Sequence, residues 1–448
     1  MGKLFGTDGA RGIAGGELTC GLAVSIGQAA AAVLAEGGRP RILIGKDPRL
    51  SSDMLEAALA AGCASVGAEV ELLGVVPTPA VADLVRCYGA DGGIVISASH
   101  HSFEYNGISL FDREGYRLSS EREDRIEAVA LEGAGELPCP QGRDLGRVTR
   151  RDKAAEDYLR RLIATAGENL RGMKLAVDCA NGAASFTARR LFEGLGAECV
   201  MLHDTPDGTN INRGCGAAHP EALAEYVKSR RLFGGVAFDG AADRCLAVDE
   251  KGNLIDGDKI LFALALDRKE RGLLPGDTAV ATAASNLGFF RSCAARGIRT
   301  AIAPEGGRYL AEEMRKTGSL IGGEPTGRLV LGEYATVGDG QLAAVQLLSL
   351  CREKGWKLSR MGELMERYPQ VVLNVKADPI RKAAFAADPG LAAAIRAAEE
   401  ALGEDGRVTV RPSATEPLIR VLVEGKDFDR INRTAVELAD LIRARTEV

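Results

Sequence analysis

Three serines and two histidines follow an apolar segment in the first quarter of the chain. Residues 93–96 (Gly-Ile-Val-Ile) are typical of a buried strand, and residues 97–102 (Ser-Ala-Ser-His-His-Ser) come directly after them. Hydroxyl groups at the point where a strand ends and a loop begins are often placed for chemistry in α/β sheets. A hydroxyl beside a histidine is also common in polar turns, so these residues alone leave a catalytic loop and a plain turn equally open.

Two aspartates, Asp239 and Asp243, follow a second apolar segment, residues 235–238. Carboxylates four positions apart in a glycine-containing loop can turn toward one hard cation, and Arg244 beside them could hold a phosphate. Two carboxylates make a weak magnesium site unless a phosphate oxygen completes the coordination shell. The alternative interpretation is a turn with a surface ion pair.

Two further loops combine charged side chains with glycine or hydroxyl groups. The first is residues 322–328 (GGEPTGR), and the second is residues 411–417 (RPSATEP), with Arg420 close behind. The second loop offers two hydroxyls, backbone N–H groups and two guanidinium groups, which together suit a phosphate dianion. As a single motif it is also consistent with a charged hairpin.

The composition excludes several classes of protein. The chain has 448 residues, of which 46% are hydrophobic and 26% charged, as in folded soluble proteins with several cores. A net charge of -6 and an aromatic content of 5% argue against binding of nucleic acid or anionic membranes. Glycine is enriched, with 55 residues in short clusters, which is typical of loops that approach small phosphorylated ligands.

The cysteines and the apolar runs indicate where the protein works. The 10 cysteines are scattered without the paired spacing of a zinc site, so we expect free thiols. No apolar run approaches the ~18 residues that cross a membrane, and the glycine-rich start lacks the pattern of a signal peptide. We therefore expect a cytoplasmic protein with no nucleic-acid or membrane partner.

Alternating helix and strand patterns predict three consecutive α/β units with mostly parallel sheets and a smaller C-terminal α+β domain. The expected domains are residues 1–150, 151–254, 255–368 and 369–448. Expected helices are 21–36, 53–65, 79–87, 120–131, 154–166, 183–195, 220–230, 258–268, 287–296, 307–316, 391–402 and 427–443. Expected strands are 41–45, 69–73, 93–97, 173–177, 198–202, 235–238, 278–282, 299–302, 371–376, 407–411 and 419–424.

Together and in this order, the four loops resemble those of the α-D-phosphohexomutase family. The resemblance covers the whole chain, with one motif in each expected domain, and includes residues 77–79 (Pro-Thr-Pro) and 210–212 (Asn-Ile-Asn). The start, residues 5–12 (FGTDGARG), is most similar to that of the bacterial phosphoglucosamine mutases. The resemblance implies a heart-shaped, four-domain enzyme that moves a phosphoryl group between O6 and O1 of a hexosamine phosphate.

The resemblance also implies roles for individual residues. The catalytic residues would be Ser99, which matches the family's phosphoserine, with His100, Arg244 and Arg11. The metal ligands would be Asp239, Asp243 and Ser99, and the substrate-binding residues Glu324, Thr326, Arg328, Arg411, Ser413, Thr415 and Arg420. The implied cofactors are Mg²⁺, a phosphoryl group on Ser99 and a hexose bisphosphate as primer. The implied partners are a hexosamine phosphate and either a second copy of the chain or a regulatory protein.

Several loop residues depart from the family pattern. The family usually has Asn-Pro at His101-Ser102, a lysine at Ser109, hydroxyl residues at Ala217-Ala218, a carboxylate at Ala241, serine and histidine at Thr326 and Arg328, and a glycine at Ala414. Pro325 also removes a backbone N–H. These replacements cluster at the loops and spare the apolar pattern of the strands.

The replacements leave two hypotheses. The protein is either an active phosphoglucosamine mutase with compensated loops, or a non-catalytic paralogue that binds a sugar phosphate or a protein partner. Ser109 and Arg328 cannot release a proton near neutral pH, so an active enzyme would have to use His100 or His101. We expect weak Mg²⁺ binding, and turnover that is absent or far below that of a phosphohexomutase with the intact motifs.

Overall fold

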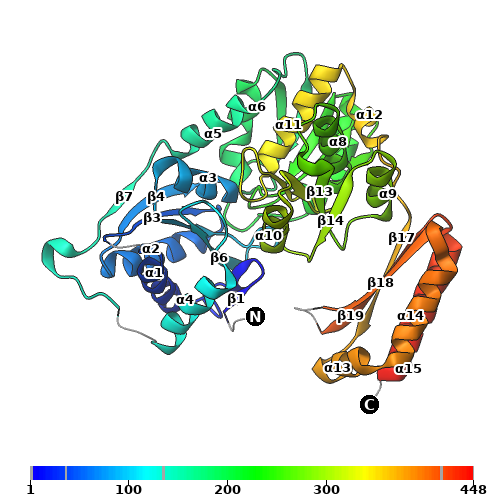
Figure 1. Cartoon of the computed structure of the whole chain (residues 1–448). Coiled ribbons are helices and arrows are strands. Elements are labelled where there is room, and N and C mark those ends of the chain that lie inside the picture. The colour runs from blue at the N-terminus through cyan, green and yellow to red at the C-terminus, as the bar shows by residue number, and fades with distance from the viewer. Residues whose placement is uncertain (1–3, 36–37, 134–136, 414–416, 447–448) are drawn as a thin grey trace. The chain divides into compact units, whose positions relative to one another are not determined.

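The computed structural model describes residues 4–35, 38–133, 137–413 and 417–446. The chain divides into two compact units. Unit 1 comprises residues 1–284 and 296–364, and unit 2 comprises residues 285–295 and 365–448. Unit 1 holds three mixed sheets and unit 2 holds a three-stranded antiparallel sheet (Figure 1).

The first sheet has seven strands in the order β1-β2-β6-β5-β3-β4-β7. They are β1 Phe5–Gly6, β2 Gly9–Ile13, β3 Arg41–Lys46, β4 Glu69–Val75, β5 Gly92–Ile96, β6 Tyr105–Asp112 and β7 Val148–Arg150. Strands β3, β4, β5 and β7 are parallel, whereas β6, β2 and β1 add antiparallel at one edge. The start of the chain, which looked like a glycine-rich loop in the sequence, is therefore a hairpin.

Four helices cover this sheet: α1 Cys20–Leu34, α2 Ser52–Ser65, α3 Thr78–Tyr88 and α4 Ser120–Glu132. Helices α1, α2 and α4 lie on one face and share its core with the buried isoleucines of β3 and β5, while α3 lies on the other face (Figure 1). Helices α1 and α2 pack closely because a Cβ on Gly27 would lie 2.6 Å from the Leu59 carbonyl oxygen.

The second sheet has five strands in the order β12-β11-β10-β8-β9. They are β8 Lys174–Asp178, β9 Glu198–Leu202, β10 Gly234–Phe238, β11 Cys245–Asp249 and β12 Leu254–Ile255, with helices α5 Ala154–Ala164, α6 Ala188–Gly194 and α7 Glu221–Arg230. The single helix expected over residues 183–195 is wrong. A 3-10 turn, Ala183–Phe186, precedes α6, and Thr187 between them leaves helical geometry while its Oγ1 accepts a hydrogen bond from Gln341 Nε2.

The third sheet has four strands in the order β14-β13-β15-β16. They are β13 Thr278–Thr282, β14 Arg299–Ala303, β15 Ile321–Gly323 and β16 Leu329–Leu331, with helices α8 Gly257–Glu270, α10 Gly307–Thr317, α11 Gly340–Lys354 and α12 Leu358–Gly362. Helix α11, which the sequence patterns did not predict, is buried along most of its length. Burial on all sides removes the alternation of apolar and polar residues that marks a surface helix.

Unit 2 contains the antiparallel sheet β17-β19-β18, covered on one face by α14 and α15 (Figure 1). Its elements are α9 Leu287–Ala295, β17 Gln370–Lys376, α13 Pro379–Ala387, α14 Pro389–Leu402, β18 Gly406–Pro412, β19 Leu418–Gly425 and α15 Phe428–Thr446. The fold class expected from the sequence is confirmed, with mixed rather than mostly parallel sheets in unit 1. None of the described helices is long and apolar enough to span a bilayer.

Candidate active site

Ser99 lies in a buried loop directly after β5, with a backbone φ of 52°. Its N–H donates to Ser97 Oγ at 3.1 Å, which holds the loop in this unusual conformation. The Ser99 hydroxyl donates to Oδ2 of Asp239 at 2.5 Å and lies 3.4 Å from Oδ1 of Asp243. The structure therefore brings together three residues that the sequence analysis singled out on two different sheets.

The two aspartates belong to the turn between β10 and β11. Asp239 Oδ1 accepts hydrogen bonds from the backbone N–H groups of Asp243 and Arg244, which closes the turn. Gly240 is required here because a Cβ would lie 2.7 Å from the Ser99 carbonyl oxygen. The serine loop and the aspartate loop are thus in backbone contact.

Burial and the neighbouring Asp243 raise the pKa of Asp239 to about 7. Burial would also raise the pKa of Asp243, but Arg328 and Arg244 lower it below its ordinary value. Because like charges repel strongly in a buried site, ionising both aspartates at once raises the electrostatic free energy of the site. A cation beside Ser99 would lower that free energy.

Arg328 supplies such a cation from the hairpin between β15 and β16. Its guanidinium lies 3.1 Å from Asp243, 3.3 Å from Asp8 and 3.7 Å from Glu324, and the side chain is buried. The backbone places it there, since the Cys245 N–H donates to the Gly327 carbonyl at 2.9 Å. Asp8, which the sequence analysis did not select, is therefore part of the site.

The other two residues of this hairpin lie together. Thr326 Oγ1 donates to Glu324 Oε2 at 3.2 Å, so the hydroxyl orients the carboxylate. Glu324 is buried and its other oxygen, Oε1, also accepts from the Gly306 N–H at 3.3 Å. Both groups remain suited to hydrogen bonds with sugar hydroxyls.

Four buried nitrogen atoms near Ser99 have no hydrogen-bond partner within the described residues: Nε of Arg11, Nε of Arg49, Nε of Arg244 and Nδ1 of His100. Burial and the charge of Arg244 lower the pKa of His100 to about 3. A cationic, dehydrated site favours the neutral imidazole, so His100 is a weak base here and its role in proton transfer stays a prediction. The unpaired arginine nitrogens are instead suited to an anion.

The loop that the sequence predicts to bind phosphate, between β18 and β19, belongs to unit 2. It is called the phosphate loop below. Arg411 on β18 and Arg420 on β19 face each other across the antiparallel pair, and Ser413 follows β18. Thr415 and Ala414 lie outside the described residues. Because this loop belongs to unit 2, the expectation that all four loops share one cleft stays a prediction.

Sequence reasoning missed two residues that hold the serine loop. Asn212 Nδ2 donates to the carbonyl oxygens of Ser99 and His101, both at 2.8 Å, and Arg49 Nη2 donates to the same two oxygens. Asn212 lay in a recognised motif without an assigned role. Arg49 was detectable only as a charged residue just beyond strand β3.

The residues around Ser99 fit a Mg²⁺ ion only in part. Oδ2 of Asp239 and Oδ1 of Asp243 converge on Ser99 Oγ, so two carboxylates and a phosphoryl oxygen on Ser99 could share one ion. Ala241 provides no third carboxylate. Within the described residues, one group of three His, Cys, Asp or Glu side chains lies close enough together to hold a metal, namely Asp178, His203 and Cys215 elsewhere in the second domain.

Four phosphoglucomutase/phosphomannomutase domain families match the chain in sequence order. Alpha/beta/alpha domain I matches residues 2–135, domain II residues 156–252, domain III residues 256–368 and the C-terminal domain residues 373–441. The chain therefore belongs to the phosphoglucomutase/phosphomannomutase family, the class of protein to which its four domains and serine loop also point.

Within this family the chain is similar to proteins named phosphoglucosamine mutase. It is 48% identical over 449 residues to the one from Caldicellulosiruptor saccharolyticus and 49% identical over 446 residues to one from Clostridium perfringens, covering 99% of this chain and 100% of each relative. A family protein from Burkholderia thailandensis has a similar structure, with a TM-score of 0.83, 25% identity and coverage of 98% of this chain and 96% of that one.

A more distant structure is that of Aspergillus fumigatus N-acetylphosphoglucosamine mutase in complex with GlcNAc-6P and magnesium. It matches with a TM-score of 0.68 and 16% identity, covering 99% of this chain and 96% of that one. At this identity the match reflects the shared fold.

Proposed function

We propose that the protein interconverts glucosamine 6-phosphate and glucosamine 1-phosphate, with Ser99 as the carrier of the phosphoryl group. The observation that carries the proposal is the convergence of the Ser99 hydroxyl with Asp239 and Asp243, at 2.5 and 3.4 Å. Relatives at 48% and 49% identity that are named phosphoglucosamine mutases support an amino sugar as the substrate.

In this proposal Ser99 Oγ gives its phosphoryl group to a sugar hydroxyl. The Oγ–P bond breaks as the new O–P bond forms, and the proton lost by the sugar hydroxyl ends on Ser99 Oγ. The hexosamine bisphosphate formed in this way would then return its other phosphoryl group to Ser99, which releases the isomeric monophosphate. Arg11 and Arg244, whose Nε atoms are unpaired, would bind the phosphoryl oxygens and stabilise their charge. The burial of Ser99 keeps water away from the phosphoryl group.

Asp239 and Asp243 would hold Mg²⁺, which would neutralise the phosphoryl oxygens during transfer. Glu324 and Thr326 would bind the sugar hydroxyls, with Arg328 holding Glu324 in place. The phosphate loop, with Arg411, Ser413, Thr415 and Arg420, would bind the phosphate that is not being transferred. A hexose bisphosphate would phosphorylate Ser99 at the start.

A catalytically impaired paralogue is the second candidate, favoured by one specific observation. Arg328 already pairs with Asp243, and the nearby histidine His100 has a pKa of only about 3. A site with a fixed cation and a poor proton acceptor would bind a sugar phosphate without turning it over quickly.

The conversion of glucosamine 6-phosphate, primed with a hexose bisphosphate, tests the proposal. We expect slow turnover that falls roughly 1,000-fold or more in Ser99→Ala, because the phosphoryl carrier is gone. The matched control is Ser102→Ala in the same loop, which should keep its activity. Intact mass should show one phosphoryl group on the wild type and none on Ser99→Ala.

Turnover that survives Ser99→Ala would overturn the proposed role of Ser99. A phosphorylated wild type with no measurable turnover would instead support the impaired paralogue.

A further inference from the structure

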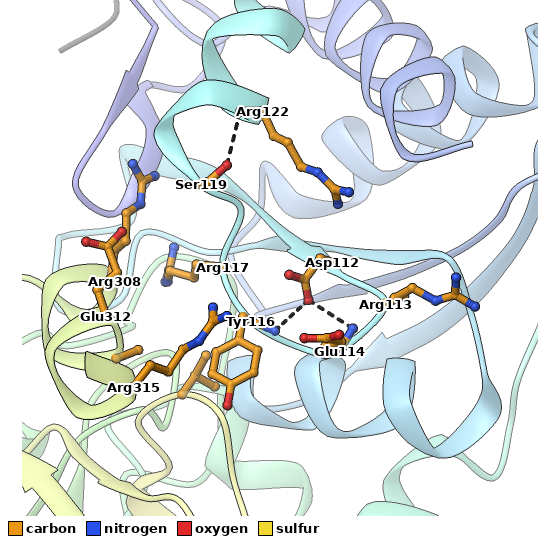
Figure 2. Close-up of a pocket in the computed structure, with 13 residues that line it drawn as sticks. Asp112, Arg113, Glu114, Tyr116, Arg117, Ser119, Arg122, Arg308, Glu312 and Arg315 are labelled. Carbon is orange, nitrogen blue, oxygen red and sulfur yellow. Dashed lines mark hydrogen bonds between the residues drawn. The ribbon is translucent and has the colours of Figure 1, made fainter. Parts of the chain in front are cut away.

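A pocket of about 280 Å³ lies in unit 1 between the segment that follows β6 and helix α10 (Figure 2). Five arginines line it against three carboxylates. The arginines are Arg113, Arg117, Arg122, Arg308 and Arg315, and the carboxylates are Asp112, Glu114 and Glu312. The lining is therefore positively charged in a protein whose net charge is -6.

The carboxylates do not neutralise two of these arginines. Asp112 Oδ1 is engaged by the N–H groups of Glu114 and Tyr116, each at 3.0 Å. In the part of the chain that the structure describes, neither Arg117 nor Arg315 forms an ion pair with a carboxylate. Both guanidinium groups thus retain donors for a ligand.

The arginines are held in position from two different domains. Arg315 on α10 stacks on the ring of Tyr116, with its guanidinium carbon 4.9 Å from the ring centroid. Arg308 pairs with the buried Glu123 and donates to Ser120 Oγ at 2.9 Å, which ties α10 to α4. This preorganisation lowers the entropy cost of binding.

The start of helix α10 adds further positive potential. Gly307, its first residue, lines the pocket, and the preceding Gly306 offers no side-chain acceptor to the first turn. The N–H groups at a helix start carry partial positive charge and favour anions.

Arg117 contributes a partly buried positive charge to the pocket. Burial and the charge of Arg328 lower the pKa of this half-buried arginine, although Asp8, Asp243 and Glu123 attract its charge. An anionic ligand beside Arg117 would offset the free-energy cost of partly burying its charge.

We propose that this pocket binds a small molecule carrying a phosphate group, through residues other than those of the phosphate loop in unit 2. Guanidinium groups from both sides match the oxygens of a phosphate in a forked geometry, and the start of α10 contributes backbone donors. The inference is independent of the proposed function, because none of the lining arginines is assigned to the phosphoryl transfer.

The pocket also adjoins the candidate active site. A Cβ on Gly307 would lie 3.3 Å from Nη1 of Arg328, the nitrogen that faces Asp8 and Glu324. Gly307 would therefore separate a ligand in the pocket from the guanidinium group of Arg328.

Calorimetric titration of the full chain with pyrophosphate, at fixed ionic strength, tests the inference. We expect Arg315→Ala and Arg117→Gln each to weaken binding by about tenfold or more, the effect of losing a charge-assisted hydrogen bond. Arg315 is exposed, so its replacement leaves the core unchanged. The matched control is Arg125→Ala, an exposed arginine of α4 outside the pocket, which should bind as the wild type does.

A fourth variant, Arg420→Ala, separates this pocket from the phosphate loop. Binding that persists in Arg420→Ala and is lost in Arg315→Ala supports the inference. Binding that is lost only in Arg420→Ala, or that Arg125→Ala weakens as much as Arg315→Ala, would overturn it. So would an absence of pyrophosphate binding by the wild type.

Discussion

Arg328 places a permanent positive charge among the acidic side chains around Ser99. Since a guanidinium stays charged at neutral pH, it keeps Asp243 ionised although burial opposes this. One positive charge thereby supplies part of the neutralisation that a divalent cation would provide. This arrangement and the missing carboxylate at Ala241 both lead us to expect weak Mg²⁺ binding.

Ala241→Asp should strengthen Mg²⁺ binding by about tenfold or more, because a third carboxylate joins Asp239 and Asp243 in the same turn. Calorimetric titration of the wild type and the variant measures the difference. An unchanged affinity would show that the side chain at position 241 does not face the metal position.

At the scale of helices, strands and loops, Asn212 links the serine loop after β5 to the aspartate turn after β10. Its Nδ2 donates to the Ser99 carbonyl at 2.8 Å, and its Oδ1 accepts from the Gly240 N–H at 2.9 Å. We assign it a positioning role, since it contacts backbone groups of both loops.

Asn212→Asp should destabilise the protein by roughly 1–3 kcal/mol and lower kcat more than it changes KM. Aspartate keeps the acceptor for Gly240 and tolerates the backbone φ of 58°, but it cannot donate to Ser99. Urea denaturation and steady-state kinetics measure the two effects. Asn169→Asp, on an exposed residue, is the charge-matched control, and equal losses in both variants would contradict the positioning role.

Helix α11 begins at a titratable cap. Asp339 accepts hydrogen bonds from the Leu342 N–H and from the Tyr158 hydroxyl, both at 2.9 Å, and burial raises its pKa to about 7. In the unfolded chain this carboxyl ionises near its ordinary value of 3.8. The folded state therefore binds the proton more tightly, and the stability from Asp339 is lost as the pH rises from about 4 through 7.

Asp339→Asn should gain stability relative to the wild type as the pH rises from 5 to 8, because asparagine keeps the cap and never ionises. Urea denaturation midpoints at the two pH values give the difference. Asp152→Asn, an exposed control, should show no such trend. A difference that stays constant with pH would refute the ionisation of Asp339 as its cause.

At the scale of the whole molecule, unit 2 contains a segment from the third domain, residues 285–295, in addition to the C-terminal residues 365–448. Helix α9 lies between β13 and β14 in sequence but belongs to unit 2. Glu424 on β19 holds it there by accepting from Asn286 Nδ2 and the Leu287 N–H, each at 3.1 Å, while pairing with Arg407.

Glu424→Ala should cost unit 2 about 3–5 kcal/mol, because it leaves Arg407 without its buried partner. Hydrogen exchange should accelerate in α9, β18 and β19 and stay unchanged in unit 1. Glu437→Ala on the exposed side of α15 is the control. Equal acceleration in both units would show that they unfold together.

The sequence by itself determined the order of most helices and strands, because the period of apolar residues is a local signal. It also placed Ser99 and Asp239 at strand ends, since both follow short apolar runs. It did not reveal β6, β11 or α11, which are so fully buried that apolar and polar positions no longer alternate.

Only the tertiary structure decided the ion pairs of Arg328 with Asp8 and Asp243. The same holds for the contact of Asn212 with Ser99 and for the arginine-lined pocket beside α10. These groups come from different sheets and lie far apart along the chain. Their proximity depends on how the three sheets of unit 1 pack together, and no local pattern of residues encodes that packing.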